Sequence, residues 1–199
     1  MTIYYIQQKI QLIGNEYRVF EAREDGAQGE LVAYARQKIM AFKEKFTFFT
    51  GEDKQTIAFE LQARQVIDLG ARYDVRNEAG DIIGTVGKAF KASLLRSTWN
   101  VYAKPDDKEP VFVARERSSG LAIARRAWGF VPFIGDLPFF LKYHFDFIDP
   151  TSEKVLATYN KTTTLRDHYK LSIEDELAER IDWRVLVATG VMMDAMQSR

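Results

Sequence analysis

Residues 73–86 read YDVRNEAGDIIGTV, and they contain the clearest copy of the pattern from which the fold follows. It opens with an aromatic residue, one charged residue and a β-branched residue, at Tyr73 to Val75. A turn-forming run follows at 77–81, where Gly80 is free to adopt a positive φ. An apolar run at 82–86 completes the unit. This alternation on either side of a turn predicts a hairpin of two antiparallel strands with one apolar face.

The same unit occurs five times along the chain. Its opening phrase is an aromatic residue, any residue, then Val or Phe, and the copies are Tyr17–Val19, Phe46–Phe48, Tyr73–Val75, Trp99–Val101 and Phe145–Phe147. Each copy precedes a polar or Gly/Pro-rich break and then an apolar run, at Leu31–Ala35, Ile57–Leu61, Ile82–Val86, Val111–Ala114 and Val155–Tyr159. A repeat of this kind along the whole chain sets the fold.

Five hairpins give ten strands, and Thr2–Gln7 and Asp167–Ile173 add two more. Twelve antiparallel strands predict a closed barrel, because closure removes the exposed sheet edges.

The C-terminal stretch Trp183–Met196 is almost wholly apolar. A helix that is apolar on nearly all sides is buried, and a twelve-stranded barrel is too wide for strand side chains alone to fill. The alternative is a transmembrane helix. Asp182 to Asp194 would span about 18 Å at about 1.5 Å per residue, against about 30 Å of hydrocarbon, and Arg184 interrupts the run. We therefore favour a mainly-β fold, with one domain over residues 1–199 and a twelve-stranded antiparallel barrel enclosing the C-terminal α-helix.

The amino-acid composition and the net charge exclude several classes of function. The 199 residues are 46% hydrophobic, and the net charge is zero, with 28 basic and 28 acidic residues. A strong global attraction to nucleic acid or to an anionic membrane is not expected, although a local patch remains open, and no nucleic-acid partner is predicted. The chain has no cysteine, which excludes disulfides, thiolate metal ligands and cysteine nucleophiles. The first eleven residues lack the pattern of a signal peptide. We expect a soluble, cytoplasmic protein.

Two further stretches carry a resemblance to a known family. Residues 82–102 read IIGTVGKAFKASLLRSTWNVY: a return strand, a basic stretch, Ser-Leu, then Trp-x-Val-Tyr. The last helix has apolar residues between two aspartates, at Asp182, Val185, Ala188, Val191 and Asp194. Together with the hairpin repeat, these features resemble the LURP-one-related proteins of the tubby C-terminal-like superfamily and, more distantly, the phospholipid scramblases.

The resemblance implies a twelve-stranded barrel wrapped around a C-terminal helix. It implies little about activity, since most LURP-one-related proteins have no assigned one. Tubby proteins bind phosphoinositides, and scramblases are associated with membranes and calcium. The chain departs from the scramblases, because it has no palmitoylation cysteines and no Asp-x-Asp-x-Asp calcium loop. Residues 174–176 are acidic but lack the spacing of calcium ligands.

Two short patterns suggest catalysis or phosphate binding only weakly. His144 and Asp146 alternate on a predicted strand, and such a pair serves either as a base or metal site or as part of a polar outer face. No third ligand or nucleophile has a recognisable spacing, so we favour the outer face. Residues 84–88 resemble a phosphate-binding loop, but the spacing is wrong and Ala89 follows the lysine. We interpret them as a turn after a strand. No catalytic residue, metal site or cofactor is predicted, and the protein is not expected to be an enzyme.

The basic residues suggest a binding site. Lys88, Lys91 and Arg96 are predicted in the connector before Trp99. Arg115, Arg117, Arg125 and Arg126 surround the start of an insertion. If the two groups converge, they form a positive patch of the size of a phosphate. The predicted ligand-binding residues are Lys88, Lys91, Arg96, Arg125 and Arg126. The alternative is an ordinary solvated surface with acidic neighbours such as Glu116.

The insertion, at about residues 118–142, contains the unusually apolar segment Phe130–Leu141. It either closes one barrel end as a lid or contacts a protein partner or the membrane interface. We expect a non-enzymatic binding module for anionic phospholipid headgroups, peripheral at the membrane. The alternative is a protein-interaction or structural scaffold without a small ligand.

Overall fold

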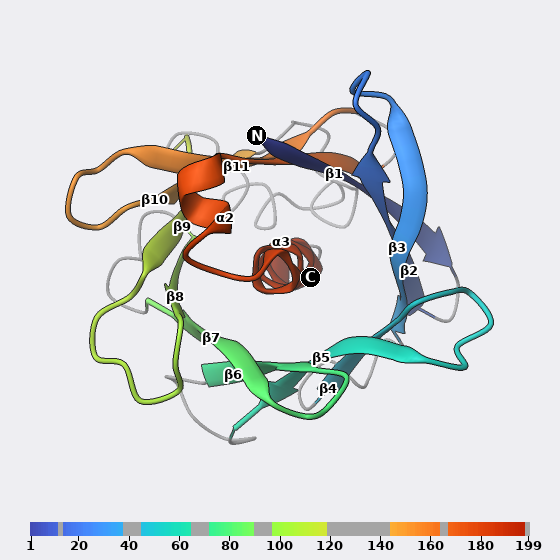
Figure 1. Ribbon diagram of the computed structural model, residues 1–199, viewed down its shortest axis with the longest axis horizontal. Helices are drawn as coiled ribbons and strands as arrows, with labels where there is room; N and C mark the ends of the chain where they lie inside the picture. The colour runs from blue at the N-terminus through green and yellow to red at the C-terminus, as the bar shows by residue number, and fades with distance from the viewer. Residues whose placement is uncertain are drawn as a thin grey trace, which may run out of the picture.

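The computed structural model describes residues 1–11, 14–37, 45–64, 72–89, 97–118, 144–163 and 167–197. Twelve strands and two helices lie in these ranges (Figure 1). The strands are β1 (Thr2–Gln11), β2 (Gly14–Ala22), β3 (Gln28–Gln37), β4 (Lys45–Phe49), β5 (Ile57–Ala63), β6 (Arg72–Asn77), β7 (Ile82–Lys88), β8 (Thr98–Tyr102), β9 (Phe112–Glu116), β10 (His144–Ile148), β11 (Val155–Lys161) and β12 (Asp167–Ile173). The helices are α2 (Asp175–Ala178) and α3 (Trp183–Gln197).

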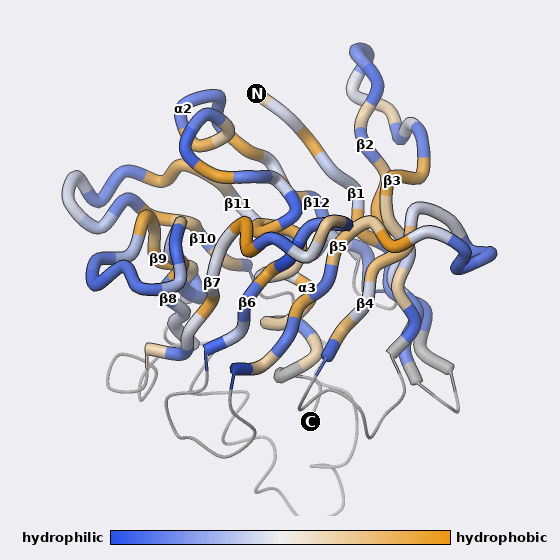
Figure 2. Tube along the Cα trace, turned by 60° about the horizontal axis from the view of Figure 1, so that its bottom comes forward, coloured by the Kyte–Doolittle hydropathy of each residue, from blue (hydrophilic) through white to orange (hydrophobic). Residues whose placement is uncertain are grey.

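The strands form a closed antiparallel barrel in which each strand pairs with its neighbours in sequence. The first and last strands complete the ring, with Tyr4 opposite Leu171. All five hairpins predicted from the repeat are present. In the hairpin of residues 73–86, Val75 of β6 lies opposite Gly84 of β7. The predicted twelve-stranded barrel is therefore confirmed. Figure 2 shows mostly hydrophilic residues in the outlying connections and hydrophobic segments along the strands.

Helix α3 fills the barrel. Figure 1 shows it end-on inside the ring of strands. Its residues from Val185 to Met193 are at most 1% exposed where they are apolar, because strand side chains surround the helix on every side. The helix begins beside Asp182, whose carboxylate accepts a hydrogen bond of 2.9 Å from the backbone N–H of Arg184. The Arg184 guanidinium turns back to Asp182, at 2.7 Å, and to Glu78, at 2.8 Å. A charged residue within the apolar run is thus held at the helix end.

The buried C-terminal helix is confirmed, and α2 was not predicted. Helix α2 is four residues long, so it carries no periodic signal, although it buries Leu177. Within the described parts of the chain, no helix is long and apolar enough to cross a membrane.

The interpretation of residues 84–88 as a turn is wrong, because β7 continues to Lys88. Gly84 faces inward at a point where α3 approaches closely. A methyl group on Gly84 would lie 2.7 Å from a methyl carbon of Val185, well inside van der Waals contact. The glycine that suggested a turn is therefore needed for packing between strand and helix.

Candidate functional site

Lys88 is the one predicted site residue that falls within the described ranges. Lys91, Arg96, Arg125 and Arg126 lie outside them, as does the insertion from residue 119 onward. Lys88 is the last residue of β7 rather than part of the following connector, and its side chain is exposed. Its Nζ lies 5.7 Å from the centre of the Trp99 ring, on the paired position of β8. This cation–π contact holds the ammonium group at the barrel end.

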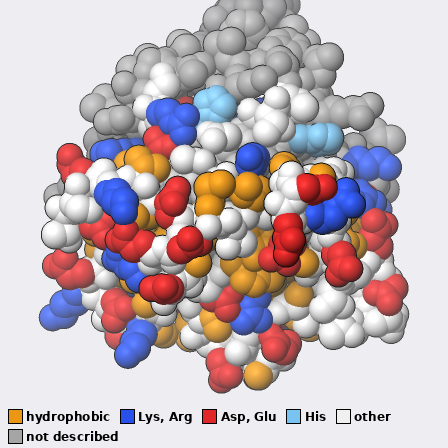
Figure 3. Space-filling model, turned by 45° about the horizontal axis from the view of Figure 1, so that its top comes forward, with side chains coloured by type: hydrophobic (Ala, Val, Ile, Leu, Met, Phe, Trp, Pro, Cys, Tyr) orange, Lys and Arg blue, Asp and Glu red, His pale blue; other side chains and the backbone are white. Residues whose placement is uncertain are grey.

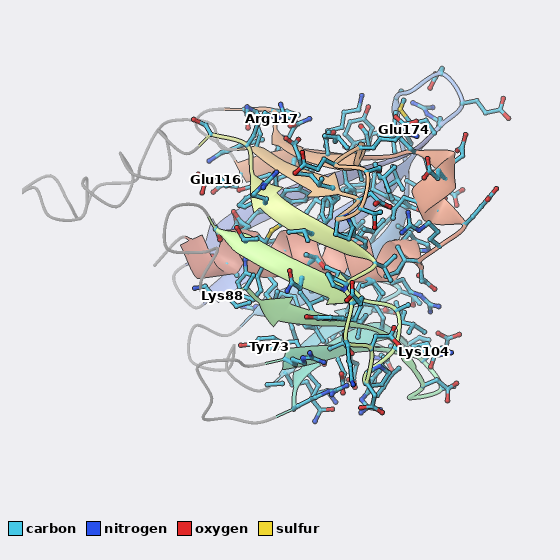
Figure 4. The ribbon with its side chains drawn as sticks, turned by 90° about the vertical axis from the view of Figure 1, so that its left-hand side faces the viewer. Tyr73, Lys88, Lys104, Glu116, Arg117 and Glu174 are labelled. Carbon is cyan, nitrogen blue, oxygen red and sulfur yellow. The ribbon has the colours of Figure 1, made fainter. Side chains whose placement is uncertain are left out.

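The strand order fixes where the other predicted residues enter. Because β7, β8, β9 and β10 are antiparallel neighbours, β7 and β9 end at the same barrel end at which β8 and β10 begin. Figure 4 shows Lys88, Glu116 and Arg117 toward this end, opposite Lys104 and Glu174. The connection that carries Lys91 and Arg96 and the one that carries Arg125 and Arg126 are thus anchored on adjacent hairpins. We call this the Lys88 end of the barrel. Convergence of the two groups stays a prediction.

Polar side chains line the inside of the barrel at the Lys88 end, and all are at most 7% exposed. They are Gln8, Tyr17, Glu116, Lys161, Tyr169 and Asp194. The carboxylate of Asp194, on α3, accepts hydrogen bonds from the hydroxyl of Tyr17, at 3.1 Å, and from that of Tyr169. Gln8 donates in turn to the Tyr17 hydroxyl, at 3.0 Å. A buried carboxylate needs such partners, so this layer fixes α3 against β1, β2 and β12.

Ion pairs occupy several charges at the Lys88 end. Lys161 pairs with Asp167 at 2.5 Å. Arg117 donates to Asp146 at 2.6 Å on the outer face, and this hydrogen bond raises the pKa of the Arg117 guanidinium above its ordinary value. Lys88 and Arg115, by contrast, make no ion pair with any residue in the described ranges.

The pair of His144 and Asp146 lies on the outer face, as favoured from the sequence. Three hydrogen bonds from Arg117 to Asp146, of 2.6–3.0 Å, commit that carboxylate to an ion pair. Among the residues with described positions, no group of three or more His, Asp or Glu side chains is placed to hold a metal ion.

Sequence reasoning missed two features of this end. Trp99 was recognised as a strand residue but not as the partner of Lys88, because only the register places them opposite each other. The Asp194 cluster was also missed. Its signal was visible, since an aspartate within an apolar helix must find hydrogen-bond donors inside the barrel.

Comparison with known proteins identifies the family of this chain. The sequence profile of the LURP-one-related family matches residues 31–194, a span that runs from within β3 to Asp194 of α3. The chain belongs to the LURP-one-related family. It is also similar to a protein from Arabidopsis thaliana known from an X-ray structure, with 12% sequence identity and a TM-score of 0.45. That similarity covers 96% of this chain and 90% of the other. No curated protein sequence matches the chain.

Family membership and the barrel fold support a binding-type module. Neither favours phospholipids over other ligands.

Proposed function

We propose that the protein is a non-enzymatic module whose Lys88 end binds anionic phospholipid headgroups. The observation that carries the proposal is Lys88 itself: an exposed ammonium group held over Trp99, with no acidic partner in the described residues. Two neighbouring hairpins bring the connections that contain Lys91, Arg96, Arg125 and Arg126 to the same end. This anchoring supports one positive patch, although sequence separates the two groups.

The attraction has to be local, because the net charge is zero. Figure 3 shows a face of the barrel on which basic and acidic side chains are mixed, with neither sign gathered. Each basic residue near an anionic membrane surface contributes about 1 kcal/mol. Five such residues give measurable binding, whereas Lys88 alone does not.

The apolar segment Phe130–Leu141 belongs to the same proposal. The insertion that contains it leaves β9 and returns to β10 at the Lys88 end. Beside basic residues, an apolar segment of this kind adds binding energy by entering the headgroup layer. In the scaffold alternative, the same segment contacts a protein partner instead.

Vesicle sedimentation tests the proposal. We expect the protein to sediment with vesicles of phosphatidylcholine and phosphatidylserine at low salt, and to be released as salt rises, because screening weakens the attraction. Vesicles of phosphatidylcholine alone should leave it in the supernatant. The triple variant Lys88→Glu, Lys91→Glu, Arg96→Glu should lose binding while its circular dichroism spectrum and melting temperature stay those of the parent.

A matched variant controls for net charge. Lys104→Glu, Lys108→Glu, Arg23→Glu makes the same charge change on exposed residues of connections at the opposite barrel end. It should bind as the parent does. Equal sedimentation with neutral and anionic vesicles, or an equal loss in both triple variants, would reject the Lys88 end as a lipid site and favour the scaffold alternative.

A further inference from the structure

A pocket of about 360 Å³ lies on the outer wall of the barrel, away from the barrel interior. It is lined by Gln62, Ala63, Arg64, Asp74, Arg76, Ile82, Pro105 and Asp106. The strands β5, β6 and β7 form its floor, and the connection from β8 to β9 forms one side. Arg72 holds that connection in place, because its Nη1 donates to the carbonyl oxygen of Pro105 at 3.2 Å while its guanidinium lies 4.4 Å from the Tyr102 ring. We call this the wall pocket.

A buried carboxylate organises the wall pocket. Asp74 faces outward on β6 but is only 5% exposed. Its Oδ1 accepts hydrogen bonds from Arg64 Nε, at 2.7 Å, and from the Thr85 hydroxyl, at 2.8 Å. Arg76 approaches the other oxygen, with Nη2 at 3.7 Å from Oδ2. Two guanidinium groups, one from the residue that follows β5 and one from β6, thus converge on one acid.

The two guanidinium groups retain hydrogen-bonding capacity. Each has five N–H donors. Arg64 uses one on Asp74 and one, at 3.5 Å, on Thr85. Arg76 donates to the carbonyl oxygen of Gly80 at 2.9 Å and makes the longer contact with Asp74. The remaining N–H groups have no acceptor in the described residues, and both side chains are partly exposed, at 29% and 34%.

Charge sets the class of ligand. Arg64 and Arg76 carry two positive charges and the buried Asp74 one negative charge, so the strand floor of the wall pocket has one positive charge left. The other acid of the lining, Asp106, lies on the connection at the side and is exposed to solvent, which screens its charge. Glu60 lies opposite Arg76 across the strands, but its carboxylate is engaged by Lys45 at 2.7 Å. A single carboxylate balances this charge, and its planar shape matches the fork of a guanidinium group. Ile82 and Pro105 offer apolar contact to the rest of the molecule.

We infer that the wall pocket binds a small organic carboxylate, held by Arg64 and Arg76, with its apolar part between Ile82 and Pro105. This site is separate from the Lys88 end and does not depend on lipid binding there. Nothing in the chemistry of the pocket requires a metal or cofactor.

Nuclear magnetic resonance of the full chain tests the inference directly. We expect the Nε–Hε resonances of Arg64 and Arg76 to shift when isobutyrate is added at millimolar concentration. Acetate should bind more weakly, because it lacks the methyl groups that contact Ile82 and Pro105. Isobutyramide has almost the same shape but no charge, and it should leave both resonances in place.

Variants connect the shifts to the pocket. Arg76→Gln should weaken isobutyrate binding about tenfold or more, since a hydrogen bond to a charged group is lost. It should still fold, because Arg64 and Thr85 continue to satisfy Asp74. Arg23→Gln, on an exposed turn, should bind as the parent does.

Three results would overturn the inference. The first is an absence of shifts at either arginine with isobutyrate. The second is an equal response to isobutyramide. The third is tighter binding of inorganic phosphate than of isobutyrate at the same two resonances, which would reassign the pocket to phosphorylated ligands.

Discussion

At the scale of single residues, Gly190 lies where α3 packs tightly against Tyr159 of the barrel wall. A methyl group there would lie 2.5 Å from a ring carbon of Tyr159, a distance that real side chains do not adopt. The Tyr159 ring stacks on Tyr169, at 4.7 Å between ring centres, so it has little freedom to move. The glycine is therefore required by packing rather than by backbone conformation.

We predict that Gly190→Ala destabilises the fold. Overpacking of this kind costs about 1–3 kcal/mol, against roughly 1 kcal/mol that alanine gains over glycine inside a helix. Urea denaturation should show a lower midpoint. Gly51→Ala is the control, because its new methyl group would meet only the flexible side chain of Asp53, at 3.1 Å. A Gly190→Ala protein as stable as Gly51→Ala would show that the helix shifts freely inside the barrel.

A second residue, Asp149, makes the stability of the fold depend on pH. The pKa of Asp149 is held well below its ordinary value by the hydrogen bond from Arg180, at 2.7 Å, and by the backbone N–H groups of Ser152 and Thr151. The unfolded chain takes up this proton more readily than the folded one. The charge of Asp149 therefore contributes fully to the free energy of unfolding above the ordinary carboxyl pKa of about 4. This contribution is lost as the pH falls toward the lower pKa that Asp149 has in the folded protein.

Asp149→Asn tests this linkage. Asparagine keeps the side-chain carbonyl oxygen that the turn uses but removes the charge that Arg180 contacts. We expect the variant to be less stable than the parent at pH 7, with the difference shrinking below about pH 4. Urea denaturation at pH 7, 5 and 3 measures it. A difference that does not change with pH would assign the effect to the turn and not to the charge.

At the scale of elements, α3 is part of the core of the barrel. We predict that Val187→Asp abolishes cooperative unfolding, because Val187 is fully buried and an unpaired charge there costs several kcal/mol. Near-ultraviolet circular dichroism and thermal melting measure the loss. Val155→Asp introduces the same side chain at a position that is 43% exposed, and it should keep the native spectrum. A native-like Val187→Asp protein would contradict a core role for the helix.

Most elements of this fold could be predicted from the sequence, because their signals are local. Aromatic and β-branched residues alternate on the first strand of each of the five hairpins, and the breaks that follow contain turn-forming residues. The failures also have local causes. Gly84 and Gly87 imitate a turn, but Gly84 is a contact point for Val185 across the barrel. Helix α2 is too short for its pattern to repeat.

At the scale of the whole molecule, the candidate sites were harder to predict than the fold. Charged residues can be counted along the chain, but whether each has a partner depends on register. Arg117 was grouped with the other basic residues, yet Asp146 neutralises it from the next strand. The wall pocket was missed for the same reason. Arg64 and Asp74 are ten positions apart, and only the pairing of β5 with β6 brings them to 2.7 Å.

Closure of the ring between β1 and β12 has a consequence for biosynthesis. Thr2 lies opposite Ile173, so the two strands that complete the barrel are almost the full length of the chain apart. This one non-local pair raises the contact order above that of the pairs between consecutive strands. All-β domains fold in milliseconds to seconds once complete. At ribosomal rates of about 5–20 residues per second, however, roughly ten seconds or more separate the synthesis of β1 from that of β12. Throughout that interval the nascent strands have an unpaired edge that other chains can pair with. Protection of this edge by chaperones during translation is therefore a greater need than help with folding once the chain is complete.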